Sequence, residues 1–251
     1  MTRDAIRQAG VALAVASGVV LGVTGDYGSG AASPSLVQPP SWAFGIWGPI
    51  YVGLLAYAVQ QALPSRRESE AQRRTGWWAA AAVLSSGFWV RVFPLEVIAA
   101  TGALVLFTFV TAGVAVWRAR PAAGALARRE AWLTRAPLGL FFGWITVATV
   151  VGSTEAVLAE PWGPAWAAGV PWAAGGLGLV GAAASAVTLA ARSSLAYPAA
   201  VTWGLLGVLV AQGADEPVVG AAALAAAVAV ATSAAGVAVR QRRSDVPSAA
   251  A

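Results

Sequence analysis

Residues 38–51 read QPPSWAFGIWGPIY, and they mark the start of a long apolar helix. Pro39 and Pro40 have no backbone N–H to donate, so they belong before the helix and lead the chain into it near Trp42. The residues that follow stay free of charge until Arg66, which leaves a run long enough to cross a lipid bilayer. This stretch therefore predicts a membrane-spanning helix at about residues 43–63.

The composition of the whole chain indicates the same class of protein. Of its 251 residues, 58% are hydrophobic and only 11% are charged, whereas a soluble domain carries roughly 25% charged residues. Charge-free runs of suitable length recur along the sequence, so we predict an all-α integral membrane protein with about eight transmembrane helices. The expected spans are residues 9–25, 43–63, 77–93, 95–117, 136–157, 171–191, 196–213 and 217–239.

The charges between these spans predict the topology. All 16 basic residues are arginine, and all but Arg91 fall at the termini or in alternate loops. By the positive-inside rule, both termini are then cytoplasmic, and we expect the protein in a bacterial inner membrane. The net charge of +5 comes from these loops, so we expect no nucleic-acid partner. The opposite loops hold the acidic residues Asp26, Glu96, Glu155, Glu160, Asp215 and Glu216.

The first span leaves one alternative open. Two arginines, an apolar run and small residues around 29–32 also resemble a cleavable signal peptide, which would leave seven spans. Gly18 and Gly22 stand at GxxxG spacing, which favours close packing against another helix instead. Gly139 and Gly143 repeat that spacing in the fifth span, beside a polar stripe of Thr146, Thr149 and Ser153, and we expect them to face a neighbouring helix.

The aromatic residues after the prolines have two interpretations. Phe44, Trp47 and Tyr51 lie on one face of the predicted helix, at i, i+3 and i+7. In the first interpretation, these rings pack against other helices and contribute to the interfacial aromatic belt. In the second, they contact a ligand. The periodicity alone favours packing.

The residue types that are missing exclude several kinds of chemistry. The chain has no Cys and no His, and it also has no Lys, so disulfides, a Schiff base on lysine and a Ser–His catalytic pair are ruled out. We therefore expect no enzyme, no catalytic residues and no metal site.

Three motifs together resemble the TspO/MBR family of tryptophan-rich sensory proteins, which are related to the mitochondrial translocator protein. They are PPSWAFGIWGPIY, FWVRVF with Trp89 and Phe93, and GWITVAT with Trp144. The resemblance covers roughly residues 9–158, and it implies a divergent member with three additional spans. We accordingly predict a TspO-like five-helix bundle at 9–158, a three-helix extension at 165–239 and a disordered cytoplasmic tail at 240–251.

The resemblance also implies a function. It favours a membrane receptor or carrier that binds a flat apolar ligand, tetrapyrrole- or sterol-like, with a sensory or regulatory role. No cofactor is required, and a porphyrin or haem would bind without His or Cys coordination. The expected partners are membrane lipid, the small apolar ligand and, as a homodimer, a second copy of the chain. The alternative is a membrane permease or transporter subunit for a small solute.

The resemblance favours the interpretation in which the aromatic face contacts a ligand, and Trp203 of the extension is expected to take no part in binding. The expected ligand-binding residues are Trp42, Phe44, Trp47, Tyr51, Trp89 and Trp144.

Overall fold

The computed structural model describes residues 2–25, 35–95, 98–119, 128–159, 165–191 and 194–244, and within these ranges the chain is helical without strands. Eight α-helices follow one another, with short 3₁₀ turns between some of them. The α-helices are α1 (Arg3–Val23), α2 (Trp47–Ala62), α3 (Glu70–Val92), α4 (Ile98–Arg118), α5 (Arg128–Ala159), α6 (Val170–Ala191), α7 (Ala196–Gln212) and α8 (Pro217–Ser244). The 3₁₀ turns are η1 (Ser41–Ile46), η2 (Pro64–Arg66), η3 (Phe93–Leu95) and η4 (Ala165–Ala168).

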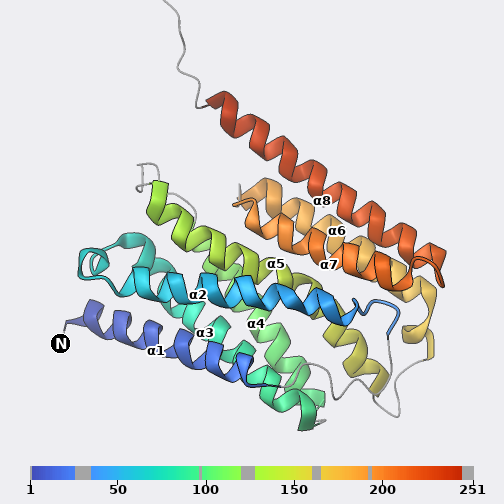
Figure 1. Cartoon of the computed structure of the whole chain (residues 1–251), viewed down its shortest axis with the longest axis horizontal. Helices are drawn as coiled ribbons and strands as arrows, with labels where there is room; N and C mark the ends of the chain where they lie inside the picture. Colours follow the sequence, from blue (N-terminus) through green and yellow to red (C-terminus); the bar gives the residue numbers. More distant parts are fainter. Residues whose placement is uncertain are drawn as a thin grey trace, which may run out of the picture.

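Helix α5 lies at the centre of the bundle. Helices α1 to α4 lie on one side of it and α6 to α8 on the other (Figure 1). The most apolar stretch of α5 is 72% buried inside the bundle, whereas the corresponding stretches of the other six long helices are 33–44% buried. Contacts between α5 and both α2 and α4 join it to the first group, while α7 packs on α5 and α8 packs on α6 and α7. The sequence-based division at residues 158–165 thus falls at the end of the helix that both groups share.

Seven of the described helices are long and apolar enough to cross a membrane. The chain is therefore an all-α integral membrane protein, as predicted. The remaining expected span, the seventh at residues 196–213, coincides with α7, whose 17 residues rise about 25 Å and fall at the lower limit for a span. Figure 1 places the start of α1 and the end of α8 toward the same end of the bundle.

Two helix ends differ from the sequence-based prediction. The predicted disordered tail begins too early, because α8 continues through residues 240–244 to Ser244; residues 245–251 lie outside the described part of the chain. Helix α1 begins at Arg3, and the side chain of Arg7, which was expected before the first span, is only 4% exposed. Its guanidinium donates to the carbonyl of Arg67 at 2.8 Å, so this arginine ties α1 to the turn after α2.

The small residues of both GxxxG pairs lie at helix crossings. A Cβ atom added to Gly18 would come within 2.4 Å of the Val83 carbonyl oxygen, and one added to Gly87 would come within 2.6 Å of the Gly18 carbonyl oxygen. Helices α1 and α3 therefore cross with their backbones in contact. At Gly143 the added atom would meet the Tyr197 carbonyl oxygen at 2.4 Å, so α5 uses its GxxxG pair to approach α7. The packing role that the spacing predicted is confirmed at both crossings.

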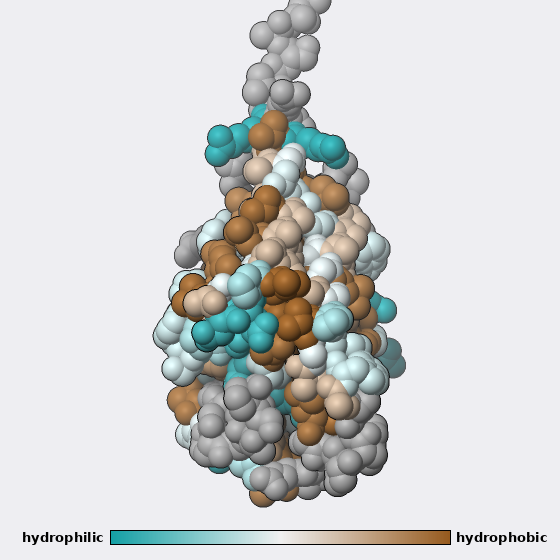
Figure 2. Space-filling view, turned by 90° about the vertical axis from the view of Figure 1, so that its right-hand side faces the viewer, coloured by the Kyte–Doolittle hydropathy of each residue, from teal (hydrophilic) through white to brown (hydrophobic). Residues whose placement is uncertain are grey.

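The outer surface of the bundle is apolar, as contact with lipid requires. Exposed large hydrophobic residues occur on all eight helices, with Leu13, Val52, Phe88, Val110, Leu179, Val210 and Val228 as examples. Figure 2 looks onto the end of the bundle at the right of Figure 1. It shows apolar side chains over much of the described surface, with hydrophilic groups near the centre, at the top and at the right edge. Water would not stabilise so much exposed hydrocarbon, whereas lipid tails do.

Candidate ligand-binding cavity

Residues 38–51 do not form one regular α-helix. Residues 41–46 form the 3₁₀ turn η1, and α2 begins at Trp47. Pro49 has no N–H to donate back to residue 45, so an α-helical hydrogen bond cannot form there, and proline is tolerated only because it falls in the first turn of α2. The 3₁₀ turn has three residues per turn and thereby keeps Phe44 above Trp47 on one face.

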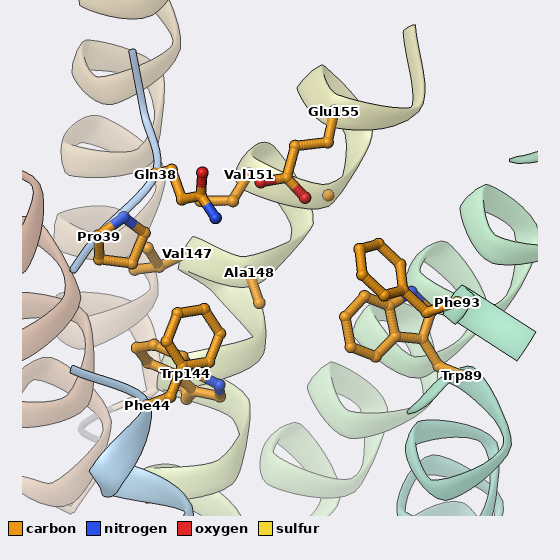
Figure 3. Close-up of a pocket in the computed structure, with 11 residues that line it drawn as sticks. Gln38, Pro39, Phe44, Trp89, Phe93, Trp144, Val147, Ala148, Val151 and Glu155 are labelled. Carbon is orange, nitrogen blue, oxygen red and sulfur yellow. The ribbon is translucent and has the colours of Figure 1, made fainter. Parts of the chain in front are cut away.

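That face opens onto a cavity whose empty space, including the part open to solvent, is about 490 Å³. Its walls come from the η1 segment, the end of α3 with η3, and α5 (Figure 3). Aromatic side chains dominate two sides, with Phe44 and Trp144 on one and Trp89 and Phe93 on the other. The complete lining is Gln38, Pro39, Phe44, Trp89, Phe93, Trp144, Val147, Ala148, Val151, Gly152 and Glu155.

A second cavity adjoins the first and extends toward α4; its empty space, including the part open to solvent, is about 360 Å³. The two share four lining residues: Phe44, Trp89, Trp144 and Ala148. Trp47 lines only the second cavity, together with Ser86, Val105, Thr108 and Ile145. The aromatic residues of η1, α3 and α5 therefore line two adjoining cavities in the bundle.

The aromatic rings on the α2 and α5 side support one another. The ring centroids of Phe44 and Trp144 lie 5.4 Å apart at an interplanar angle of 80°, and those of Trp47 and Trp144 lie 6.4 Å apart at 79°. Both are edge-to-face arrangements, which bring the positive edge of one ring to the negative face of the other. Tyr51 stacks on Trp47 at 5.1 Å and 22°. This packing holds the cavity wall rigid before any ligand arrives.

The six residues expected to bind a ligand take three different positions. Phe44, Trp89 and Trp144 line both cavities, and Trp47 lines the second. Tyr51 lines neither cavity and supports Trp47 from behind. Trp42 also lines neither; it is 50% exposed and packs edge-on against Trp203 of α7 at 5.3 Å. The structure thus brings four of the six together around the hollows.

The chain matches the model of the TSPO-like protein family over residues 11–236. It belongs to that family. The matched range includes α6 and α7 and most of α8, the helices that the sequence analysis treated as an extension. No curated protein and no solved structure matches the chain. Family membership and the apolar helices together make this TSPO-like chain an integral membrane protein of the general receptor or carrier type.

The TSPO-like chain uses its additional helices to hold the cavity. The indole Nε1 of Trp203 donates to the carbonyl oxygen of Ala43 at 2.8 Å. One turn further along α7, a Cβ atom added to Gly207 would lie 3.1 Å from Cβ of Pro39, which lines the larger cavity. Trp203 lines neither cavity, but α7 contacts the segment that carries Phe44, and the sequence did not predict this contact. Sequence periodicity could not predict this contact, because the two residues lie 160 positions apart in the chain.

One polar residue of the cavity was assigned to the wrong environment from the sequence. Glu155 was grouped with the acidic residues of the outer loops, although the expected span 136–157 includes it. In the structure it lies on α5, and its carboxyl group enters the cavity. The helical period could have indicated this, since Ala148, Val151 and Glu155 follow Trp144 at i+4, i+7 and i+11. Its Oε1 atom is buried and accepts no hydrogen bond from the described residues.

The indole N–H of Trp89 is a second buried polar group at the cavity wall without a described hydrogen-bond partner. Buried polar groups are nearly always hydrogen-bonded in folded proteins, because leaving one unpaired costs roughly 1–3 kcal/mol. A donor group on a ligand would satisfy Glu155, and an acceptor would satisfy Trp89. The cavity therefore offers flat apolar contact over most of its wall and hydrogen bonds at a few points.

Proposed function

We propose that this TSPO-like protein is a non-enzymatic membrane receptor or carrier for a flat apolar ligand, tetrapyrrole- or sterol-like, with a sensory or regulatory role. The observation that supports the proposal most strongly is the cavity between Phe44 and Trp144 on one side and Trp89 on the other. Opposed aromatic rings provide large contact area with flat molecules at small entropic cost, since each ring has only two side-chain torsions.

Metal coordination has no part in this proposal. The chain contains neither His nor Cys, which are the usual axial ligands of haem iron together with Met and Tyr. Both tyrosines of α2 lie away from the cavities, since Tyr51 supports Trp47 and Tyr57 is fully buried in the core. Stacking and apolar contact would therefore provide the affinity for a tetrapyrrole.

Titration of the protein in lipid nanodiscs with protoporphyrin and with its uncharged dimethyl ester tests the proposal. We expect saturable quenching of tryptophan fluorescence by at least one of the two. Trp89→Ala should weaken that binding by about 1–3 kcal/mol, the range for losing one large aromatic contact. Trp132→Ala removes a tryptophan that is 70% exposed and outside both cavities, so it should leave the affinity unchanged.

Two results would contradict the proposal. One is quenching that never saturates with either porphyrin; the other is equal affinity for wild type and Trp89→Ala when both are folded. Accumulation of a small solute in proteoliposomes that does not depend on Trp89 would point to the permease instead.

A further inference from the structure

Glu155 is the one ionisable side chain that the described structure places in the wall of either cavity. It lies at one end of the larger cavity, near Gln38, and the aromatic side chains Phe44 and Trp144 lie further along the same wall (Figure 3). The cavity therefore has a polar, acidic end and an apolar, aromatic body.

The position of Glu155 follows from the register of α5. Trp144, Ala148, Val151 and Glu155 stand on one face of the helix, and all four line the cavity. The length of three helical turns, about 16 Å, separates Trp144 from Glu155 along the axis. A ligand of several fused rings stacked near Trp144 can reach the carboxyl group with a short substituent.

The hydrogen bonding of Glu155 is incomplete without a ligand. Its Oε1 atom is buried and has no hydrogen-bond partner in the described part of the chain. A carboxylate that is removed from water without a partner is costly, and a cation or a hydrogen-bond donor brought beside it offsets that cost. A second carboxylate brought to the same place would add repulsion to the loss of water.

We infer that the ligand of this cavity is a flat, multi-ring molecule with a protonated amine at one edge, which pairs with Glu155, and that the cavity discriminates against ligands with a carboxylate at that edge. The inference rests on the proposed function and specifies the class of its ligand. Under it, a tetrapyrrole with carboxylate substituents binds only with those substituents turned away from Glu155.

Three probes that share one ring system test the inference. Pyrenemethylamine, pyrenemethanol and pyreneacetic acid carry a cation, a neutral hydroxyl and an anion on the same flat body. Energy transfer from tryptophan to pyrene reports their binding to the protein in nanodiscs of zwitterionic lipid, with empty nanodiscs as the blank. For wild type we expect the amine to bind roughly tenfold or more tighter than the acid, with the alcohol between them.

The variant Glu155→Gln keeps the size and shape of the side chain and removes its charge. We expect it to bind pyrenemethanol as wild type does, and to bind the amine and the acid within about threefold of each other. Glu216→Gln removes an acidic residue just before α8 that lines neither cavity, and it should retain the full preference for the amine. If Glu155→Gln bound none of the probes, Glu155→Asp, which keeps the charge, would have to restore the preference for the amine.

The results separate this inference from the proposed function. Equal binding of all three probes to wild type, or an amine preference that survives Glu155→Gln, would overturn the inference and leave the flat-ligand function standing. Failure of every probe and of both porphyrins to bind wild type would overturn both.

Discussion

The indole Nε1 of Trp203 lies 2.8 Å from the carbonyl oxygen of Ala43 and donates a hydrogen bond to it. Ala43 immediately precedes Phe44, which lines both cavities, and the edge-on contact of Trp203 with Trp42 lies beside this bond. Helix α7 therefore fixes the 3₁₀ turn from which the aromatic wall begins. Helix α7 thus helps to position the residues of the candidate site, although it lies far from them in the sequence.

Substitution of Trp203 should therefore weaken ligand binding indirectly, because this residue does not line either cavity. We expect Trp203→Ala to lower the affinity for the porphyrin that binds wild type by about 1 kcal/mol, the usual net value of one hydrogen bond. Trp203→Phe keeps a ring that can pack on Trp42 but removes the same hydrogen bond, so it should lose a similar amount. Unchanged affinity for Trp203→Ala in the fluorescence titration would show that η1 holds its shape alone.

The crossing of α5 and α7 should be sensitive to a single methyl group. A Cβ atom at position 143 would approach the Tyr197 carbonyl oxygen to 2.4 Å and Cβ of Ala200 to 2.8 Å, so the helices must move apart. We expect Gly143→Ala to destabilise the protein by about 1–3 kcal/mol, as overpacking does. Gly178→Ala is the matched control, because its added atom meets nothing within 4 Å. Equal melting temperatures for the two variants would disprove the close crossing.

A buried hydrogen bond joins α3 to α5 at the opposite end of the bundle from Glu155. The side-chain amide of Gln72 is fully buried and donates to the hydroxyl of Thr134 at 2.9 Å. A double-mutant cycle with Gln72→Leu and Thr134→Val should give a coupling energy of roughly 0.6–1.7 kcal/mol, the range for side-chain hydrogen bonds between membrane helices. Additive effects of the two substitutions on stability would mean that the bond contributes nothing.

Iron should have little influence on the binding of a tetrapyrrole. Since the chain offers no His or Cys, we expect the affinities for haem and protoporphyrin to agree within about tenfold. Parallel titrations monitored by tryptophan fluorescence measure the ratio. A hundredfold preference for haem would require an iron ligand that stacking does not provide.

The topology proposed from the arginines is open to a direct test. Arg66, Arg67, Arg73 and Arg74 cluster around the turn between α2 and α3, so this turn should face the cytoplasm. Reporter fusions within residues 64–76 and 118–135 should both give cytoplasmic signals. Periplasmic signals from both sites would reverse the orientation of the whole bundle.

Local sequence was sufficient to predict the helices and some of their contacts. The expected spans overlap α1 to α8 one by one, and the GxxxG spacings at Gly18 and Gly143 mark real crossings. The aromatic face of Phe44 and Trp47 was also predicted, although its backbone is a 3₁₀ turn followed by an α-helix. Glu155 falls within the expected span 136–157, but it was grouped with the loop acids because of its charge, so its place in the cavity was not predicted.

The membrane helices of this chain can be predicted from local sequence, because in lipid each segment must satisfy its own backbone hydrogen bonds and therefore carries its own apolar signature. Which helices meet depends instead on packing between distant segments. Lipid tails are as apolar as leucine side chains, so hydrophobicity does not select a partner helix, and close packing and polar contacts between distant segments do. The hydrogen bond from Trp203 to Ala43 is one such contact.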